Sequence, residues 1–197
     1  MKLALPETET GIKFVDKLST NLSKKFEVTK SSSLESAIKL AIYLFVLGRN
    51  KQAMELLDSF VFNIPEDHRG YLLGNKIDGI SVLAYFCYKI GEKNKQSALS
   101  KQIISLSDNI DIDDMDWFVD EANDELEYFI SDRDTLAAMI NSLSKQEIID
   151  GYASHIIKFA FFHSVIVGCF DKRYSDLSQR LGDYLDYELQ ELERELL

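Results

Sequence analysis

Apolar residues recur at helical intervals along almost the whole chain, whereas the alternation of apolar and polar residues typical of strands is scarce. The C-terminal segment is the clearest case, with leucines every three or four residues: Leu177, Leu181, Leu185, Leu189, Leu192 and Leu196. Such intervals place side chains on one face of an α-helix. Only two prolines, the residues least compatible with a helix interior, occur in 197 residues. The sequence therefore predicts an all-α fold.

The apolar runs and the residues between them predict about nine helices. Ser32 with Glu35, and Ser144 with Glu147, have the spacing of a capping box, in which a hydroxyl and a carboxylate satisfy backbone amides at a helix start. Asn50 is expected to cap the third helix. A fourth helix, ending at Ile90, should follow a stretch that contains Gly70, Gly74 and Gly79. The other expected helices are 8–27, 34–47, 50–62, 94–107, one within 108–134, 135–143, 144–168 and the C-terminal leucine segment.

A weak internal repeat relates two of these helix pairs. Residues 41–53 align with residues 84–98 at an offset of 43 with one insertion, and each copy places a glycine, Gly48 or Gly91, after its first helix. A poorer third copy at 160–173 has Gly168 in that place. Residues 34–107 thus resemble tetratricopeptide-like helical hairpins, although that family repeats about every 34 residues. The resemblance implies antiparallel hairpins stacked as a short solenoid, and an irregular helical bundle is the alternative.

Length and composition indicate one globular domain. Apolar residues make up 46% of the chain, which is ample for a core. Its two cysteines, Cys87 and Cys169, each lie in an apolar run, so we expect them in the core and not in a disulfide framework. The predicted domain spans 1–197 and comprises N-terminal hairpins over 8–107, an acidic segment over 108–134 and C-terminal helices over 135–197.

Two segments bear on localisation. The apolar stretch before Pro6 is too short for the hydrophobic part of a signal peptide. The longest apolar run, 159–167, is interrupted by His163 and is far below the roughly 20 residues that a membrane span needs. We therefore expect a cytoplasmic protein that does not enter a membrane.

Acidic residues are concentrated in one segment. Residues 108–134 contain twelve acids and a single base, Arg133, and this excess equals the whole net charge of −11. Elsewhere acids and bases are equal in number. A local negative field of this kind repels nucleic acid and favours a basic protein as partner.

A helical wheel of the acidic segment, drawn at about 100° per residue, separates an apolar stripe from an arc of carboxylates. Trp117, the only tryptophan, and Tyr128 fall inside this arc. Large aromatic residues within a charged rim are typical of interface hot spots. A solvated helix face, or aromatics that cover a neighbouring loop or helix, are the alternatives. The predicted partner-binding residues are Asp113, Asp116, Trp117, Asp120, Glu121, Asp124, Glu127 and Tyr128.

Signals for catalysis are weak. Asp116, Asp120 and Asp124 have the spacing to share a magnesium ion, but a single helix lacks the opposing ligands. No histidine lies in a metal-binding motif, and His155 and His163 are expected to be packed and hydrogen-bonded inside a helix. The chain has neither a glycine-rich phosphate loop nor a nucleophile elbow. We therefore expect no catalytic residue, no metal and no cofactor.

These features favour stoichiometric binding over catalysis. In overall character the chain, which is helical, acidic and without catalytic motifs, resembles bacterial immunity proteins that neutralise nucleic-acid-cleaving toxins. That resemblance implies that the acidic helix occludes the site of a basic toxin. The alternative is an adaptor that binds a peptide in a groove between hairpins near Tyr43, Tyr85 and Tyr88. A metal-dependent enzyme is the least favoured hypothesis.

Overall fold

The computed structural model describes residues 3, 9–65, 70–107, 115–131, 142–169 and 172–197. These residues form helices and no strand, which confirms the all-α prediction. They contain eight α-helices against the nine or so expected, and the helix expected at 135–143 lies outside the described residues except for its last two positions. The α-helices are α1 (Lys13–Lys25), α2 (Ser31–Val46), α3 (Asn50–Phe60), α4 (Tyr71–Ile90), α5 (Lys93–Leu106), α6 (Asp116–Ser131), α8 (Lys145–Gly168) and α9 (Ser175–Leu196), and short 3-10 turns occupy Val61–Asn63 and Lys172–Tyr174.

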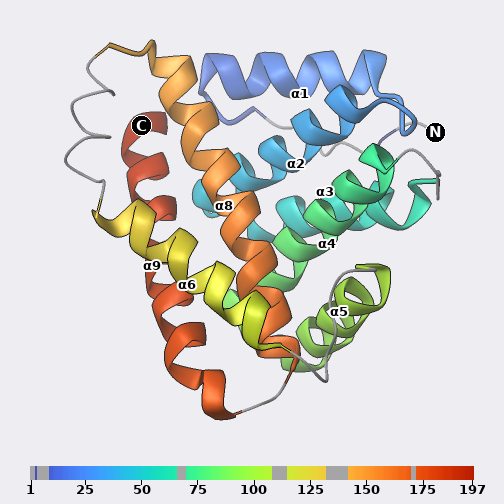
Figure 1. The fold of residues 1–197 in the computed structure, drawn as a ribbon. Helices are drawn as coiled ribbons and strands as arrows, with labels where there is room; N and C mark the ends of the chain where they lie inside the picture. Colours follow the sequence, from blue (N-terminus) through green and yellow to red (C-terminus); the bar gives the residue numbers. More distant parts are fainter. Residues whose placement is uncertain (1–2, 4–8, 66–69, 108–114, 132–141, 170–171) are drawn as a thin grey trace.

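Helix α4 lies at the centre of the arrangement and packs against α2, α3, α5 and α8. Helix α1 covers α2 at one end of the molecule, and α8 and α9 form the most extensive helix pair (Figure 1). Helix α6 crosses in front of α8 in the view of Figure 1. No helix in the described part of the chain combines the length and the apolar character needed to cross a membrane.

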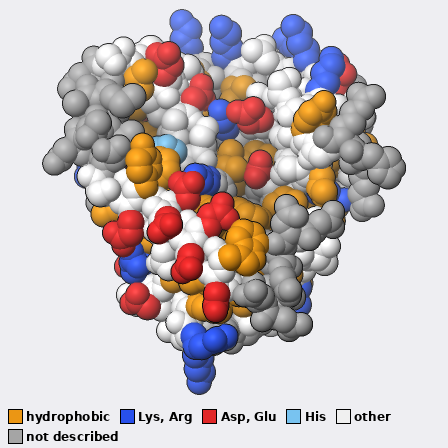
Figure 2. Space-filling model, in the orientation of Figure 1, with side chains coloured by type: hydrophobic (Ala, Val, Ile, Leu, Met, Phe, Trp, Pro, Cys, Tyr) orange, Lys and Arg blue, Asp and Glu red, His pale blue; other side chains and the backbone are white. Residues whose placement is uncertain are grey.

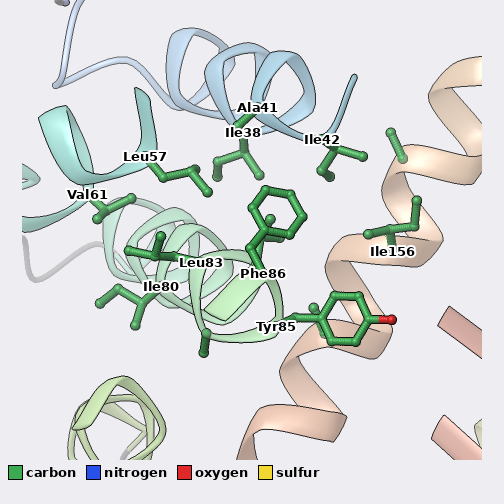
Figure 3. Packing of buried hydrophobic residues seen from close by; sticks show 14 of the residues in the cluster. Ile38, Ala41, Ile42, Leu57, Val61, Ile80, Leu83, Tyr85, Phe86 and Ile156 are labelled. Carbon is green, nitrogen blue, oxygen red and sulfur yellow. The ribbon is translucent and has the colours of Figure 1, made fainter. Parts of the chain in front are cut away.

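The core is built where α2, α4 and α8 meet. Ile38 and Ile42 of α2 point toward Phe86 of α4, with Ile156 of α8 on the other side (Figure 3). Phe86 stacks on Phe45 with 3.9 Å between ring centroids. These helices are apolar on most of their circumference because they are surrounded by other helices.

Two buried tyrosines tie distant helices together. Tyr43 and Tyr85 are both 0% exposed. The hydroxyl of Tyr43 donates to Asp150 of α8 at 3.0 Å, and that of Tyr85 donates to Asp186 of α9 at 2.7 Å. Each phenol therefore satisfies its polar end at the edge of the core.

The helix–glycine–helix pattern of the internal repeat is confirmed. Gly48 follows α2 and Gly91 follows α4, with φ of +73° and +81°, a left-handed conformation that only glycine adopts without strain. The next helix begins two residues later in both copies, and α2 packs on α3 as α4 packs on α5.

The capping box at α8 is also confirmed. The amide of Glu147 donates to the Ser144 hydroxyl at 3.3 Å, and the Ser144 amide donates to the Glu147 carboxylate at 2.8 Å. The other two predicted caps are wrong. Helix α2 begins at Ser31, so Ser32 lies inside it, and Asn50 is the first residue of α3 with Arg49 before it. Their starts depend on packing between helices and not on a side-chain cap.

The prediction of a glycine-containing stretch before the fourth helix is wrong as well, because Gly74 and Gly79 lie inside α4. A Cβ at Gly79 would come within 2.5 Å of Val61 Cγ1, so this glycine permits close helix packing. Gly168 serves the same purpose as the last residue of α8, where a Cβ would lie 2.9 Å from Ser100 Cβ.

Candidate functional site

Large aromatic side chains hold α6 against α8. Phe118 of α6 contacts Phe161 and Phe162, with ring centroids 5.8 and 5.4 Å apart, and Phe129 contacts Phe159 at 5.5 Å. Phe118, Ala122 and Leu126 are the buried residues of this helix. The apolar stripe predicted from the helical wheel therefore faces the core, and the opposite arc faces outward.

A shallow hollow of about 670 Å³ lies along the outward arc of α6. Trp117 and Tyr128 border it and are 44% and 59% exposed. Figure 2 shows the acidic side chains gathered over the position that α6 occupies in Figure 1. The predicted residues that share this hollow, called here the acidic face, are Trp117, Asp120, Glu121, Asp124 and Tyr128.

Neighbouring helices neutralise both borders of the acidic face. On one side the Lys158 ammonium of α8 lies 2.7 Å from the Glu125 carboxylate. On the other side Arg180 of α9 pairs with Glu127 and donates to the Asn123 side-chain oxygen at 3.2 Å. Between these borders, Asp120, Glu121 and Asp124 form no ion pair or hydrogen bond within the described part of the chain.

The remaining predicted residues lie apart from this hollow. Asp116 accepts a hydrogen bond of 3.4 Å from the Tyr174 hydroxyl of the 3-10 turn before α9, and Glu127 pairs with Arg180 of α9 itself. Asp113 lies outside the described residues. Glu125 also borders the hollow, although it is not among the predicted partner-binding residues. The helical wheel places it at the edge of the carboxylate arc.

A second hollow, called here the α4–α8 groove, has a volume of about 710 Å³ and was not predicted. Trp117 and Glu121 border both hollows, so the groove and the acidic face are continuous. Apolar side chains of α4, α6 and α8 form most of its wall, and Asp78 of α4 adds a carboxylate. Burial, and then the charge of Glu35, raises the pKa of Asp78 to about 6. This groove cannot be predicted from local sequence patterns, because α4 and α8 are far apart in the chain.

The histidines and the cysteine that could take part in chemistry are packed in or against the core. His155 Nδ1 lies 3.2 Å from the buried Glu188 carboxylate, and His163 is 1% exposed with no hydrogen-bond partner at Nε2. Only His155 therefore has the hydrogen bond expected of both. Cys87 is buried, which raises the pKa of its thiol to about 11 and leaves it unreactive. No group of three or more acids, histidines or cysteines among the described residues is arranged to hold a metal ion.

Of the three tyrosines near which an adaptor groove was expected, Tyr43 borders a smaller hollow of about 420 Å³ together with residues of α1, α2 and α8. Tyr43 and Tyr85 are core residues, and of the three tyrosines only Tyr88 is exposed, at 46%.

No protein-family model matches this chain, and no curated protein and no solved structure matches it either. The basis for inferring function is therefore the chemistry of the acidic face and of the α4–α8 groove.

Proposed function

We propose that this protein is a stoichiometric inhibitor that binds a basic protein through the acidic face, in the manner of an immunity protein that neutralises a nuclease-type toxin. A single observation carries the proposal. The only tryptophan and an exposed tyrosine border one hollow together with three carboxylates that have no partner among the described residues. In this proposal the protein acts in the cytoplasm, without catalysis and without a cofactor.

The aromatic and acidic residues have different parts in binding. Trp117 and Tyr128 supply apolar area that a partner would desolvate, which is the usual source of hot-spot energy. Asp120, Glu121 and Asp124 would attract a basic surface and pair with its lysines or arginines. Since none of the described residues pairs with them, these charges are available to another protein.

Occlusion follows from the chemistry of the partner. A protein that cleaves nucleic acid needs a basic surface to hold phosphates. Carboxylates spaced along one helix present a comparable series of negative charges, so the acidic face would cover that surface and exclude the substrate.

The first experiment is affinity capture from cells that naturally produce the protein. Wild type is compared with a triple variant, Trp117→Ala, Asp120→Asn and Asp124→Asn. The matched control carries Tyr71→Ala, Asp183→Asn and Glu193→Gln, which removes one exposed aromatic and two exposed acids elsewhere. We expect wild type and control to retain a basic protein that the triple variant loses, and retention to weaken with salt.

The second experiment uses that basic protein in purified form. An equimolar amount of wild type should suppress its nucleic-acid cleavage, and the triple variant should not. Equal capture by wild type and triple variant would exclude the acidic face as the binding site. Capture without suppression of cleavage would instead favour an adaptor.

A further inference from the structure

The α4–α8 groove has the dimensions and walls of a small-molecule site. Its volume of about 710 Å³ lies within the range of roughly 300–1,000 Å³ that is typical of such sites. Leu73 and Ile77 of α4, Ile157 and Phe161 of α8 and Trp117 of α6 all border it. This wall fits the apolar body of a ligand.

Gly74 keeps the groove open. It borders the groove from within α4, where glycine is unfavourable compared with alanine. A Cβ at Gly74 would meet no atom within 4 Å, in contrast to Gly79, where a Cβ would collide with Val61. Packing therefore explains Gly79 but not Gly74, whose missing side chain leaves space where the chain borders the groove.

Asp78 gives the groove a charge that no described residue neutralises. This half-buried carboxylate has no hydrogen bond or ion pair in the described part of the chain. With its pKa raised to about 6, it is mostly ionised at neutral pH despite its apolar surroundings. An unpaired charge in such surroundings is costly unless a ligand pairs with it.

Counted over the described residues that border it, the groove is negatively charged. Glu121 adds a second carboxylate that has no partner among the described residues. Among the described residues that border the groove, Lys158 is the one cation, and its ammonium is held 2.7 Å from Glu125 and 5.4 Å from the centre of the Phe129 ring. An anionic ligand would therefore meet two unpaired carboxylates.

We propose that the α4–α8 groove binds a small organic cation, with a primary ammonium group at Asp78 and an aromatic or aliphatic body against Leu73, Ile77 and Phe161. Trp117, which also borders the groove, would contact the same ligand through its ring. This site does not depend on the proposed inhibitor function, because Asp78 and Gly74 border the groove and not the acidic face.

The lone tryptophan makes the groove directly observable, since every change in tryptophan emission arises from Trp117. The probe is 4-phenylbutylamine, titrated into the full chain at neutral pH. Its neutral and anionic analogues, 4-phenyl-1-butanol and 4-phenylbutyrate, carry the same apolar body. We expect saturable binding of the amine, binding of the alcohol at least tenfold weaker, and no saturation with the carboxylate.

Variants locate the bound amine. Asp78→Asn should weaken amine binding at least tenfold, to the level of the alcohol. Asp183→Asn removes an exposed acid of α9 and should leave amine binding unchanged. Gly74→Leu should fill the groove and abolish binding of both amine and alcohol, with thermal unfolding showing that the variant remains folded.

Four results would overturn the proposal. They are the absence of saturable amine binding by fluorescence and calorimetry, equal affinity for amine and alcohol, unchanged amine binding in Asp78→Asn, and amine binding that persists in Gly74→Leu. Loss of the captured basic partner would bear only on the acidic face, so the two proposals fail separately.

Discussion

Asp78 makes the fold less stable at neutral pH. Its pKa is raised to about 6 in the folded protein from 3.8, so the folded state binds the proton more tightly than the unfolded chain does. Stability is therefore greatest while the carboxyl is protonated and falls as pH rises through this interval. Because the side chain is partly solvated, the cost at pH 7 is about 1–2 kcal/mol, less than the full shift would give.

Asp78→Asn should consequently raise the free energy of unfolding by about 1–2 kcal/mol at pH 7 and have little effect below pH 4. Urea unfolding at a series of pH values measures the change in the free energy of unfolding at pH 7 and below pH 4. A variant that is less stable than wild type at pH 7 would mean that the carboxylate has a stabilising partner.

His163 has the opposite dependence on pH. Burial, aided by the charge of Lys89 and opposed by that of Asp186, lowers its pKa to about 4 from 6.5. The unfolded chain then binds the proton more tightly, so stability is lost as pH falls from 6.5 through 4. Tyr85 and Tyr88 contact the ring at 5.3 and 4.6 Å between centroids, and these apolar contacts disfavour a charged imidazole.

His163→Gln, which has no group to protonate, should therefore flatten the acid side of the stability curve by about 2 kcal/mol between pH 7 and pH 4. Asp78 acts in the same interval with the opposite sign, so the comparison is made in the Asp78→Asn background. His155→Gln is the control, because His155 is partly exposed and pairs with Glu188. An unchanged slope in His163→Gln would show that His163 is not buried as a neutral ring.

At the scale of one helix, α4 offers two glycines with opposite requirements. Gly74→Ala should raise the free energy of unfolding by about 0.5–1 kcal/mol, because alanine restricts the unfolded chain and meets no atom in the fold. Gly79→Ala should lower it by about 1–3 kcal/mol, because Val61 must move. Thermal and urea unfolding of both variants test this. If Gly74→Ala is less stable than wild type, close packing at this position, and not open space at the groove, requires the glycine.

Glycines and helix caps show which features of the fold can be predicted from sequence and which cannot. Local signals were correct at Gly91 and at Ser144 with Glu147, where the left-handed backbone and the cap involve only neighbouring residues, but the same spacing at Ser32 and Glu35 does not cap α2. The sequence did not reveal that Gly79 lies inside a helix, because its reason is contact with Val61, which lies on the preceding 3-10 turn. Contacts between elements are not encoded in helical periodicity.

The candidate site divides in the same way. Helical periodicity alone predicts that Trp117 and Tyr128 project from the acidic face, and both are exposed. It does not predict which acids neighbouring helices neutralise, because Lys158 and Arg180 come from α8 and α9. The α4–α8 groove needs both helices and α6, so Asp78 could not be distinguished from any other helical acid.

At the scale of the whole molecule, α6 presents the acidic face yet is joined to the rest mainly through side chains. Its buried residues belong to the same continuous core as those of α2, α4, α8 and α9. Ion pairs from Lys158 and Arg180 connect it further. We therefore expect α6 to unfold together with the other helices, as the prediction of one domain over 1–197 requires.

This expectation can be tested without labelling, because emission from Trp117 reports on α6 while far-ultraviolet circular dichroism reports on all helices. The two urea transitions of wild type should coincide. In Phe118→Ala, which removes the ring packed on Phe161 and Phe162, they should separate, with the fluorescence transition at lower urea. Separate transitions in wild type would show that α6 unfolds independently of the other helices. Binding of a partner to the acidic face would then have to include the entropic cost of ordering α6.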